Sequence, residues 1–339
     1  MRVLLIGGTG FIGPHVARAL QRAGHDVGVF HRPATQRSVS AASILHDESN
    51  TQIAPITHVT GDRRDLAASV DQLEAFAPDV VVDLILSSGR QARELMKVFR
   101  GRARRVVALS SCDVYRACGV LHELEEGPLE PLPLTEASPL RTTLQTYPPA
   151  QIQKLQHVFE WLDEEYDKIP VERAILGDPS LPGTVLRLPM VYGPGDALHR
   201  FLPVLQRMDR GEPIVLEEKH AAWRAPRGFV VNVAAAIALA ATSPQAGGRI
   251  YNVAEPESFS ELEWVRQIAA AADWHGDIVV LPAGRAPADA KIPGNLDQHW
   301  VVDSTRIRDE LGYREPIDRN TAIAQTVAWE RAHAARSQR

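Results

Sequence analysis

The chain opens with a short apolar stretch that breaks into spaced glycines. Val3 to Ile6 is a continuous apolar run, typical of a buried parallel strand, and Gly7, Gly10 and Gly13 follow it. Between a strand and a helix, such glycines provide a tight turn, let a pyrophosphate approach bare backbone, and allow close helix packing. We expect a helix from Phe11 to about Ala23, with its free N–H groups at the phosphates. These features predict a dinucleotide-binding turn.

The pattern that follows extends this unit into a sheet. Gly24 breaks the helical pattern, and the apolar run Val27 to Phe30 completes a βαβ unit of about 30 residues. Further apolar runs lie at Ile56 to Thr60, Val80 to Ile85, Val106 to Ser110 and Gly183 to Leu188. They alternate with helical patterns at Leu66 to Phe76, Arg90 to Arg100 and Gln151 to Tyr166. This alternation predicts an α/β fold, a Rossmann-type doubly wound parallel sheet.

The character of the sequence changes after residue 188. Residues 1–188 are expected to form the Rossmann domain, and residues 189–339 mainly a smaller C-terminal α/β substrate-binding domain, with segments that can return to the sheet. Helices are predicted there at Phe201 to Met208, Val230 to Ala241, Ser260 to Ala272 and Thr321 to Ala335. Two loops interrupt the first domain: the Ser-rich segment Ser38 to Thr51 and the proline-rich segment 127–149. The second is typical of a lid or a substrate-binding loop.

Composition and charge argue against several classes of protein. The chain has 339 residues and a formal net charge of −5, which argues against nucleic acid as a partner. Its two cysteines, Cys112 and Cys118, form no disulfide framework, and no histidine spacing suggests a metal site. No apolar run approaches the ~18 residues of a membrane span, and a core strand begins at the N-terminus. We therefore expect a cytoplasmic protein without a membrane segment or a catalytic metal.

Four separated segments share the pattern of a known family. They are GGTGFIG at 7–13, GDRRD at 61–65, SSCDVY at 110–115 and LRLPMVYGPGD at 186–196. Together they resemble the extended, or atypical extended, short-chain dehydrogenase/reductase family, the NAD-dependent epimerase/dehydratase group that mostly acts on nucleotide sugars. Residues 251–253 and 303–313 are similar to its C-terminal half. The resemblance implies cofactor contacts from Gly7, Thr9, Gly10, Phe11, Ile12, Gly13, His31, Arg32, Asp62, Arg63, Leu84 and Lys168.

The end of the second predicted strand bears on the choice of dinucleotide. Proteins of this fold that bind NAD usually place an acidic side chain there, whereas an arginine accommodates the extra phosphate of NADP. This chain has His31 and Arg32 at that position and no carboxylate. Because the guanidinium fork pairs well with phosphate oxygens, we predict that NADP is preferred, with NAD as the alternative.

The resemblance implies three catalytic residues, of which two are easily placed. Ser111 stands four residues before Tyr115, as the catalytic serine of the family does, and Lys168 matches the lysine that lowers the pKa of a catalytic tyrosine. That tyrosine should lie four residues before the lysine, but Glu164 occupies the position. Tyr166 lies only two residues before Lys168, which on a regular helix is nearly the opposite face.

A proline offers a solution to this spacing. Proline is favoured in the first turn of a helix, so Pro170 indicates a helix that begins near Ile169 and leaves Tyr166 and Lys168 in a non-helical entry. We therefore predict Tyr166 as the proton-transfer residue. Tyr147 in the proline-rich loop and Asp113 beside Ser111 are alternatives, and loss of the usual acid/base is another.

Two functional hypotheses follow. The first is an NAD(P)-dependent epimerase/dehydratase or reductase that transfers hydride on a sugar or nucleotide sugar, with Arg200, Arg224 and Arg227 as candidates to hold its diphosphate or else as surface arginines. The second is an NAD(P)-binding sensor or RNA-associated protein that has kept the fold and lost the chemistry, as in chloroplast RNA-binding members of the family. The resemblance also implies a possible homodimer, since the family often pairs through two long helices.

Overall fold

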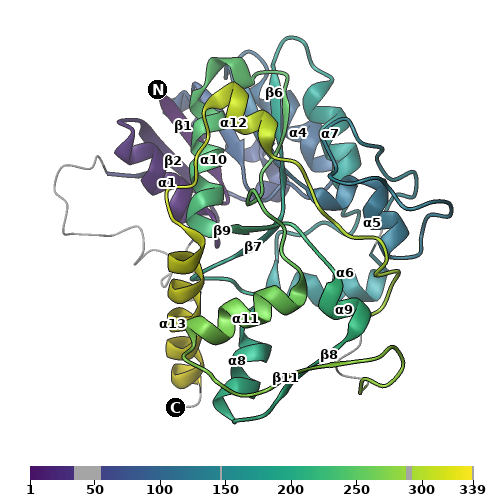
Figure 1. Cartoon of the computed structure of the whole chain (residues 1–339). Coiled ribbons are helices and arrows are strands. Elements are labelled where there is room, and N and C mark those ends of the chain that lie inside the picture. The colour runs from purple at the N-terminus through teal and green to yellow at the C-terminus, as the bar shows by residue number, and fades with distance from the viewer. Residues whose placement is uncertain (34–54, 146, 288–291, 338–339) are drawn as a thin grey trace.

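A seven-stranded sheet runs through the centre of the molecule (Figure 1). The structure is a computed structural model that describes residues 1–33, 55–145, 147–287 and 292–337, so the predicted loop Ser38 to Thr51 lies outside the described residues. The strands are β1 (Arg2–Ile6), β2 (Asp26–His31), β3 (Thr57–Thr60), β4 (Val80–Asp83), β5 (Arg105–Ser111), β6 (Gly183–Leu188) and β10 (Ile250–Asn252). Every neighbouring pair is parallel, in the order β10-β6-β5-β4-β1-β2-β3. The predicted fold class is confirmed.

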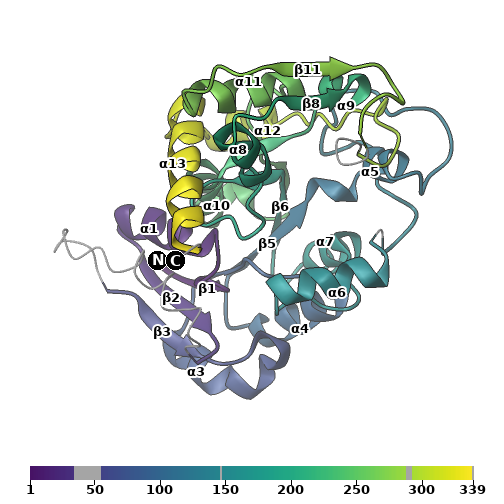
Figure 2. The same cartoon turned by 90° about the horizontal axis from the view of Figure 1, so that it is seen from below.

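Helices cover both faces of the sheet, as the period-two pattern of the strands requires. On β1, Val3 and Leu5 pack toward α1 (Gly13–Arg22) and α10 (Val230–Thr242). Leu4 and Ile6 face the other way, toward α3 (Val70–Phe76), α4 (Gly89–Phe99) and α7 (Lys168–Leu176). Figure 2 shows α1 and α10 on one side and α3, α4 and α7 on the other. Because all four side chains are buried, β1 anchors both cores.

The strand order reverses between β1 and β4. From β1 the chain proceeds outward through β2 and β3 on one side, while β4, β5 and β6 continue on the other. The register pairs Ile6 with Asp83, so these two strands end side by side. In open parallel sheets, ligands bind outside the carboxyl ends of the strands at such a reversal. This position is therefore the expected place for a ligand.

The second half of the chain adds shorter elements. They are β7 (Met190–Tyr192), α8 (Leu202–Asp209), β8 (Ile214–Glu217), α9 (Glu218–Ala222), β9 (Arg227–Phe229), α11 (Glu261–Ala271), β11 (Ile278–Leu281), α12 (Thr305–Leu311) and α13 (Arg319–Ser337). In Figure 1, α8, α9, α11, β8 and β11 gather below the sheet, beyond the carboxyl ends of its strands. The domain boundary at residue 188 stays a prediction, although α10 and β10 bring the later chain back against the sheet. Within the described ranges, every helix is too short or too polar to pass through a bilayer.

Two predicted helices are shorter than expected. The pattern at 66–76 forms a helix only from Val70 onward, after two 3₁₀ turns at Arg63–Asp65 and Ala67–Ser69. The pattern at 151–166 gives α6 (Pro149–Val158), and the chain then leaves the helix. The Asp163 carboxylate accepts a hydrogen bond from the Ser88 hydroxyl at 2.8 Å, and its backbone N–H donates to the Ser87 hydroxyl at 2.9 Å. These tertiary contacts override the local helical pattern.

The segment before α6 is irregular, as its prolines predict. Several short elements were not predicted, among them the 3₁₀ turn Cys112–Val114, the helix α5 (Arg116–Leu121), and the 3₁₀ turn Pro244–Ala246. Between α5 and α6, the described residues of 127–148 form neither a regular helix nor a named strand. Hydrogen bonds from the Arg141 N–H to the Val114 carbonyl oxygen and from the Arg116 N–H to the Pro139 carbonyl oxygen, both at 2.8 Å, place this segment against the residues that follow β5.

Candidate active site

The glycine turn follows β1 directly. Gly7 has a φ of +80°, a left-handed conformation that favours glycine, and a Cβ on Gly13 would lie 2.3 Å from the carbonyl oxygen of Gly8. Gly10 differs, because its φ is not in that region and a Cβ there would meet only the Gly7 carbonyl oxygen, at 3.6 Å. The fold itself therefore requires glycine at 7 and 13. At Gly10 it leaves open space of the kind that a diphosphate would fill beside bare backbone.

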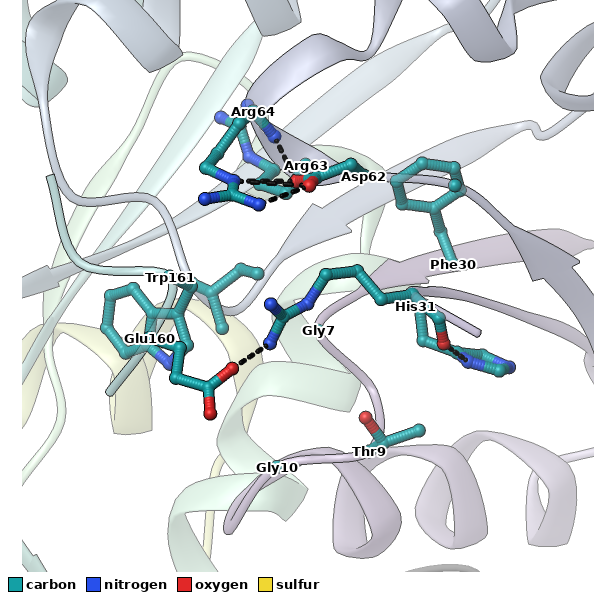
Figure 3. A pocket seen from close by; sticks show the side chains of 13 residues that line it. Gly7, Thr9, Gly10, Phe30, His31, Asp62, Arg63, Arg64, Glu160 and Trp161 are labelled. Atoms are coloured by element: carbon teal, nitrogen blue, oxygen red, sulfur yellow. Dashed lines mark hydrogen bonds and ion pairs between the residues drawn. The ribbon is translucent and has the colours of Figure 1, made fainter. Parts of the chain in front are cut away.

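A cleft of about 600 Å³, open space included, lies beside this turn (Figure 3). Its lining combines the ends of β1 and β2, the GDRR segment and the turn after α6. Of the predicted cofactor contacts, the lining contains Gly7, Thr9, Gly10, His31, Arg32, Asp62 and Arg63. Phe11, Ile12, Gly13, Leu84 and Lys168 lie outside that lining, whereas Phe30, Ile85, Glu160 and Trp161 belong to it without having been predicted. The cleft therefore lies at the strand reversal.

All three side chains of the GDRR segment are already engaged. Arg64 holds the Asp62 carboxylate, with its terminal nitrogen 2.7 Å from Oδ2, and this hydrogen bonding lowers the pKa of Asp62. Arg63 is buried and pairs with Asp83 at 2.7 Å beneath the cleft. Asp62 therefore remains ionised at the cleft, while the Arg63 guanidinium supports the wall and is turned toward β4.

Arg32 reaches across the cleft from the end of β2. Its guanidinium lies 2.7 Å from the Glu160 carboxylate, and the two side chains are 42% and 52% exposed. In Figure 3, a dashed line from the labelled Glu160 side chain marks this ion pair. The neighbouring His31 has its Nε2 3.0 Å from Nδ1 of His58 and its Nδ1 2.6 Å from the carbonyl oxygen of Arg32. The strand end thus presents a cation whose counter-ion comes from a distant loop.

The helix that follows the predicted catalytic residues begins where Pro170 indicates. α7 starts at Lys168, and Asp167 caps it by accepting a hydrogen bond from the Ile169 N–H at 2.8 Å. Tyr166 therefore precedes the helix and is not constrained to its opposite face. The prediction of a non-helical entry is confirmed for Tyr166, whereas Lys168 occupies the first helical position.

Two tyrosines meet one buried carboxylate in the turn that follows β5. The hydroxyls of Tyr166 and Tyr147 donate to Oδ2 of Asp113 at 3.2 Å and 3.3 Å, and the two rings lie 5.7 Å apart. Asp113 is buried, and its Oδ1 has no hydrogen-bond partner among the described residues. Burial raises the pKa of Asp113 against the opposing effect of the Arg141 and Lys168 charges.

The negative charge of Asp113 also affects the pKa values of the two tyrosine hydroxyls. Burial, followed by the Asp113 charge, raises the pKa of Tyr166 well above its usual value, and the pKa of Tyr147 is raised by the same two causes. Both phenols therefore keep their protons at neutral pH, and Asp113 is the group of this cluster that can accept one.

Lys168 and Ser111 complete the cluster. The Lys168 ammonium donates to the carbonyl oxygens of Leu86 and Leu109, the latter at 3.1 Å, and lies 5.6 Å from the centre of the Tyr166 ring. Burial lowers the pKa of Lys168 to about 8, against the attraction of Asp113, Asp83 and Glu172. The Ser111 hydroxyl accepts a hydrogen bond from the Asp113 N–H at 3.2 Å. The structure thus brings the three predicted catalytic residues together at the ends of β4 and β5.

Some of this cluster was beyond prediction from sequence. Asp113 was weighed as an alternative, but its contact with two tyrosines carries no local signal. Glu160 and Trp161 were missed because they fall within a predicted helix.

The three candidate arginines have different surroundings. Arg200 pairs with Asp196 at 2.7 Å. Arg227 stacks 4.5 Å over the Trp264 ring and pairs with Glu261, whereas Arg224 is exposed. In the described part of the chain, no group of three His, Cys, Asp or Glu side chains could hold a metal ion.

Comparison with known proteins decides the family. The profile of the NAD dependent epimerase/dehydratase family matches residues 3–254, which include the glycine turn and the Ser111 to Lys168 cluster. The chain belongs to this family.

Individual members of the family show how far the likeness extends. The chain is 32% identical over 136 residues to the chloroplast stem-loop binding protein of 41 kDa b of Arabidopsis thaliana, covering 38% of this chain and 34% of that one. It is 36% identical over 88 residues to a dTDP-glucose 4,6-dehydratase of Streptomyces griseus, covering 25% and 24%. The first match thus covers about a third of the length of its relative, and the second about a quarter.

Solved structures of the family share the whole fold. The UDP-glucuronic acid 4-epimerase of Bacillus cereus, in complex with UDP-glucuronic acid and NAD, superposes with a TM-score of 0.69 over 98% of this chain and 100% of that one, at 14% identity. At this identity the likeness concerns the fold alone. It extends over the C-terminal half, which the family profile covers only to residue 254.

Proposed function

We propose that the protein is an NAD(P)-dependent epimerase, dehydratase or reductase that acts on a sugar or nucleotide sugar. One observation carries the proposal: the glycine turn after β1 and the Tyr166–Asp113–Lys168 cluster open at the carboxyl ends of β1, β4 and β5. Membership of the family and the nucleotide-sugar names of two related proteins support it. The open space beside Gly10 fits a diphosphate. When bound, the dinucleotide would supply a nicotinamide ring that accepts and returns a hydride.

Tyr166, Asp113 and Ser111 have different tasks in the proton transfer. A substrate hydroxyl that contacts Tyr166 Oη gives its proton to that oxygen, while the phenol proton moves along the existing hydrogen bond to Asp113 Oδ2. Asp113 suits this task because burial raises its pKa toward the working range of a base. Tyr166 then acts as a relay, and the reverse movement returns the proton when the carbonyl is reduced. Ser111, beside Asp113, orients the reacting oxygen.

Lys168 has a separate task in this proposal. It reaches the region between β4 and β5, where the family places the ribose hydroxyls of the nicotinamide side. With a pKa lowered to about 8, the amine keeps its charge at neutral pH and can lose it just above. Its positive charge offsets the negative charge that Asp113 carries before it accepts the proton.

We further propose that NADP is the preferred dinucleotide. Arg32 lies at the end of β2, where the 2′ position of the adenosine ribose is held in this fold. A guanidinium there favours a phosphate over a hydroxyl. A cytoplasmic location and a homodimer remain part of the proposal; the free, buried cysteines fit a reducing compartment.

Calorimetry followed by turnover tests the proposal. Purified protein is titrated with NADP⁺ and NAD⁺, and then incubated with dTDP-glucose or UDP-glucuronic acid while absorbance near ~340 nm and product NMR are recorded. We expect micromolar binding, tighter for NADP⁺, and dinucleotide-dependent conversion of a nucleotide sugar. No heat from either dinucleotide at millimolar concentration would overturn the proposal entirely. Binding without conversion of any sugar would instead support the sensor hypothesis.

A further inference from the structure

The ion pair between Arg32 and Glu160 occupies the position that decides the dinucleotide. Glu160 lies 128 positions further along the chain than Arg32, in the turn between α6 and α7, yet both line the same cleft. Figure 3 shows Glu160 beside Trp161, the other residue of this turn that lines the cleft. Sheets of this fold that bind NAD supply an acidic side chain from the end of the second strand. Here a carboxylate reaches the same place from a loop.

The other charges around the cleft are paired more firmly. Arg64 contacts both oxygens of Asp62, at 3.1 Å from Nε and at 2.7 Å from a terminal nitrogen, and its backbone N–H adds a bond at 2.9 Å. Arg63 is buried against Asp83. Arg32 and Glu160 are instead joined by one hydrogen bond, at 2.7 Å, while their exposure of 42% and 52% is similar to the 60% and 37% of Arg64 and Asp62. Of these ion pairs, the Arg32–Glu160 pair is therefore the one that an incoming ligand can open at least cost.

A carboxylate in this position has opposite effects on the two dinucleotides. The 2′-phosphate of NADP needs the Arg32 guanidinium, so it must displace Glu160 and then remain beside a like charge. The 2′-hydroxyl of NAD can donate a hydrogen bond to the same carboxylate. Arg32 thus favours the phosphate, while Glu160 holds Arg32 away from it.

We propose that Glu160 is a specificity-determining residue of the dinucleotide cleft, which limits the preference for NADP by competing with its 2′-phosphate for Arg32. This inference rests on the proposed function, in which the cleft holds a dinucleotide. The turn after α6 brings Glu160 to the cleft because Asp163, three residues later, is fixed by Ser87 and Ser88. Selectivity in this protein would thus depend on two segments that are remote in sequence.

Calorimetric titration of four proteins with NADP⁺ and NAD⁺ tests the inference: the unmodified chain, Glu160→Gln, Arg32→Gln and the double variant. We expect Glu160→Gln to bind NADP⁺ about threefold to fivefold more tightly, and NAD⁺ no more tightly than before. Arg32→Gln should weaken NADP⁺ selectively. In the double variant, the gain from Glu160→Gln should fall below about twofold, because there is no guanidinium left to release.

The control is Glu165→Gln, which removes a charge from an exposed side chain of the same turn outside the cleft lining. It should leave both affinities unchanged, and an equal gain in NADP⁺ affinity from this variant would refute the competition. An unchanged NADP⁺ to NAD⁺ ratio in Glu160→Gln, with Arg32→Gln still weakening NADP⁺, would refute the role of Glu160 alone. If the unmodified chain bound neither dinucleotide, the proposed function would fail together with the inference.

Discussion

The Tyr166 hydroxyl donates to Asp113 across 53 positions of sequence, at 3.2 Å, although the tyrosine lies two residues from Lys168 and not four. This contact exists because α7 begins at Lys168, so the backbone before it is extended and free to turn the phenol inward. The usual helical spacing is thus replaced by a bend at a helix start. The bend brings the Lys168 ammonium to 5.6 Å from the centre of the Tyr166 ring.

Exchange of the two tyrosines for phenylalanine should separate their roles. Tyr166→Phe removes the hydroxyl that relays the proton, so kcat for nucleotide-sugar conversion should fall about 10²- to 10⁴-fold. Tyr147→Phe is the matched control, since Tyr147 donates to the same Asp113 oxygen at 3.3 Å. Its kcat should fall less than about tenfold. The comparison is made at saturating substrate by product NMR, and equal losses in the two variants would contradict the assignment of the relay to Tyr166.

Asp113→Asn should make the protein more stable at neutral pH while impairing turnover. Burial raises the folded-state pKa of Asp113 above its unfolded value near 3.8, so its ionisation opposes folding as pH rises. The unfolding free energy of the unmodified protein, relative to Asp113→Asn, should therefore decrease between pH 4 and pH 7. Urea unfolding at several pH values measures this difference.

Asp163→Asn provides the control for that pH dependence. Burial raises the pKa of Asp163, but the hydrogen bonds from the Glu165 N–H and the Ser88 hydroxyl, together with Arg90, outweigh it, so the net pKa is lowered. The stabilising effect of the Asp163 carboxylate is present above pH 4 and is lost as pH falls further. The difference between the unmodified protein and Asp163→Asn should therefore be flat from pH 4 to pH 7. A flat curve for Asp113→Asn as well would show that Asp113 is not held at a raised pKa.

Alanine substitutions in the glycine turn should separate effects on protein stability from effects on dinucleotide affinity. Gly10→Ala adds a Cβ with only an ordinary contact at 3.6 Å, so unfolding free energy should change by less than about 1 kcal/mol, while dinucleotide affinity falls at least about tenfold. Gly13→Ala places its Cβ 2.3 Å from a carbonyl oxygen and should destabilise the protein by about 1–3 kcal/mol or more. Calorimetry and urea unfolding report the two effects, and unchanged affinity in Gly10→Ala would argue against a diphosphate at this turn.

The sheet could be predicted because its signal is local. Val3 and Leu5 face one core while Leu4 and Ile6 face the other, and this burial on both faces is written into a single apolar run. β10 was not predicted, since three residues hold too little pattern to identify a strand. Pro170 likewise predicted the start of α7 to within one residue, because proline restricts the backbone of its own neighbourhood, although Lys168 lies inside the helix and not before it.

The charge partners in the site could not be predicted, because tertiary contacts decide them. Glu160 fell within an expected helix, but the chain leaves the helix before it, Asp163 is held by Ser87 and Ser88, and the Glu160 carboxylate meets Arg32. Tyr147 reaches Asp113 from a proline-rich loop, where side-chain direction follows from no repeating pattern. The sequence thus predicted where these strands end, but it did not predict which side chains face one another there.

A buried ion pair next to the proposed catalytic cluster provides a last prediction. Glu172 accepts hydrogen bonds from Arg187 at 2.9 Å and 2.8 Å and from the Ser110 hydroxyl at 2.6 Å, which ties α7 to β5 and β6. Both charged side chains are buried, so Glu172→Gln leaves the Arg187 cation without a counter-charge and should cost about 3–5 kcal/mol of unfolding free energy.

Lys219→Gln, in an ion pair with Asp297 whose side chains are 55% and 56% exposed, should cost less than about 1 kcal/mol. Because Glu172 lies one helical turn after Lys168, its loss should also loosen the lysine and reduce dinucleotide affinity, which the exposed control leaves intact. Urea unfolding and calorimetry of both variants make the comparison. Similar stability losses in the two would show that the buried pair does not hold α7 against the sheet.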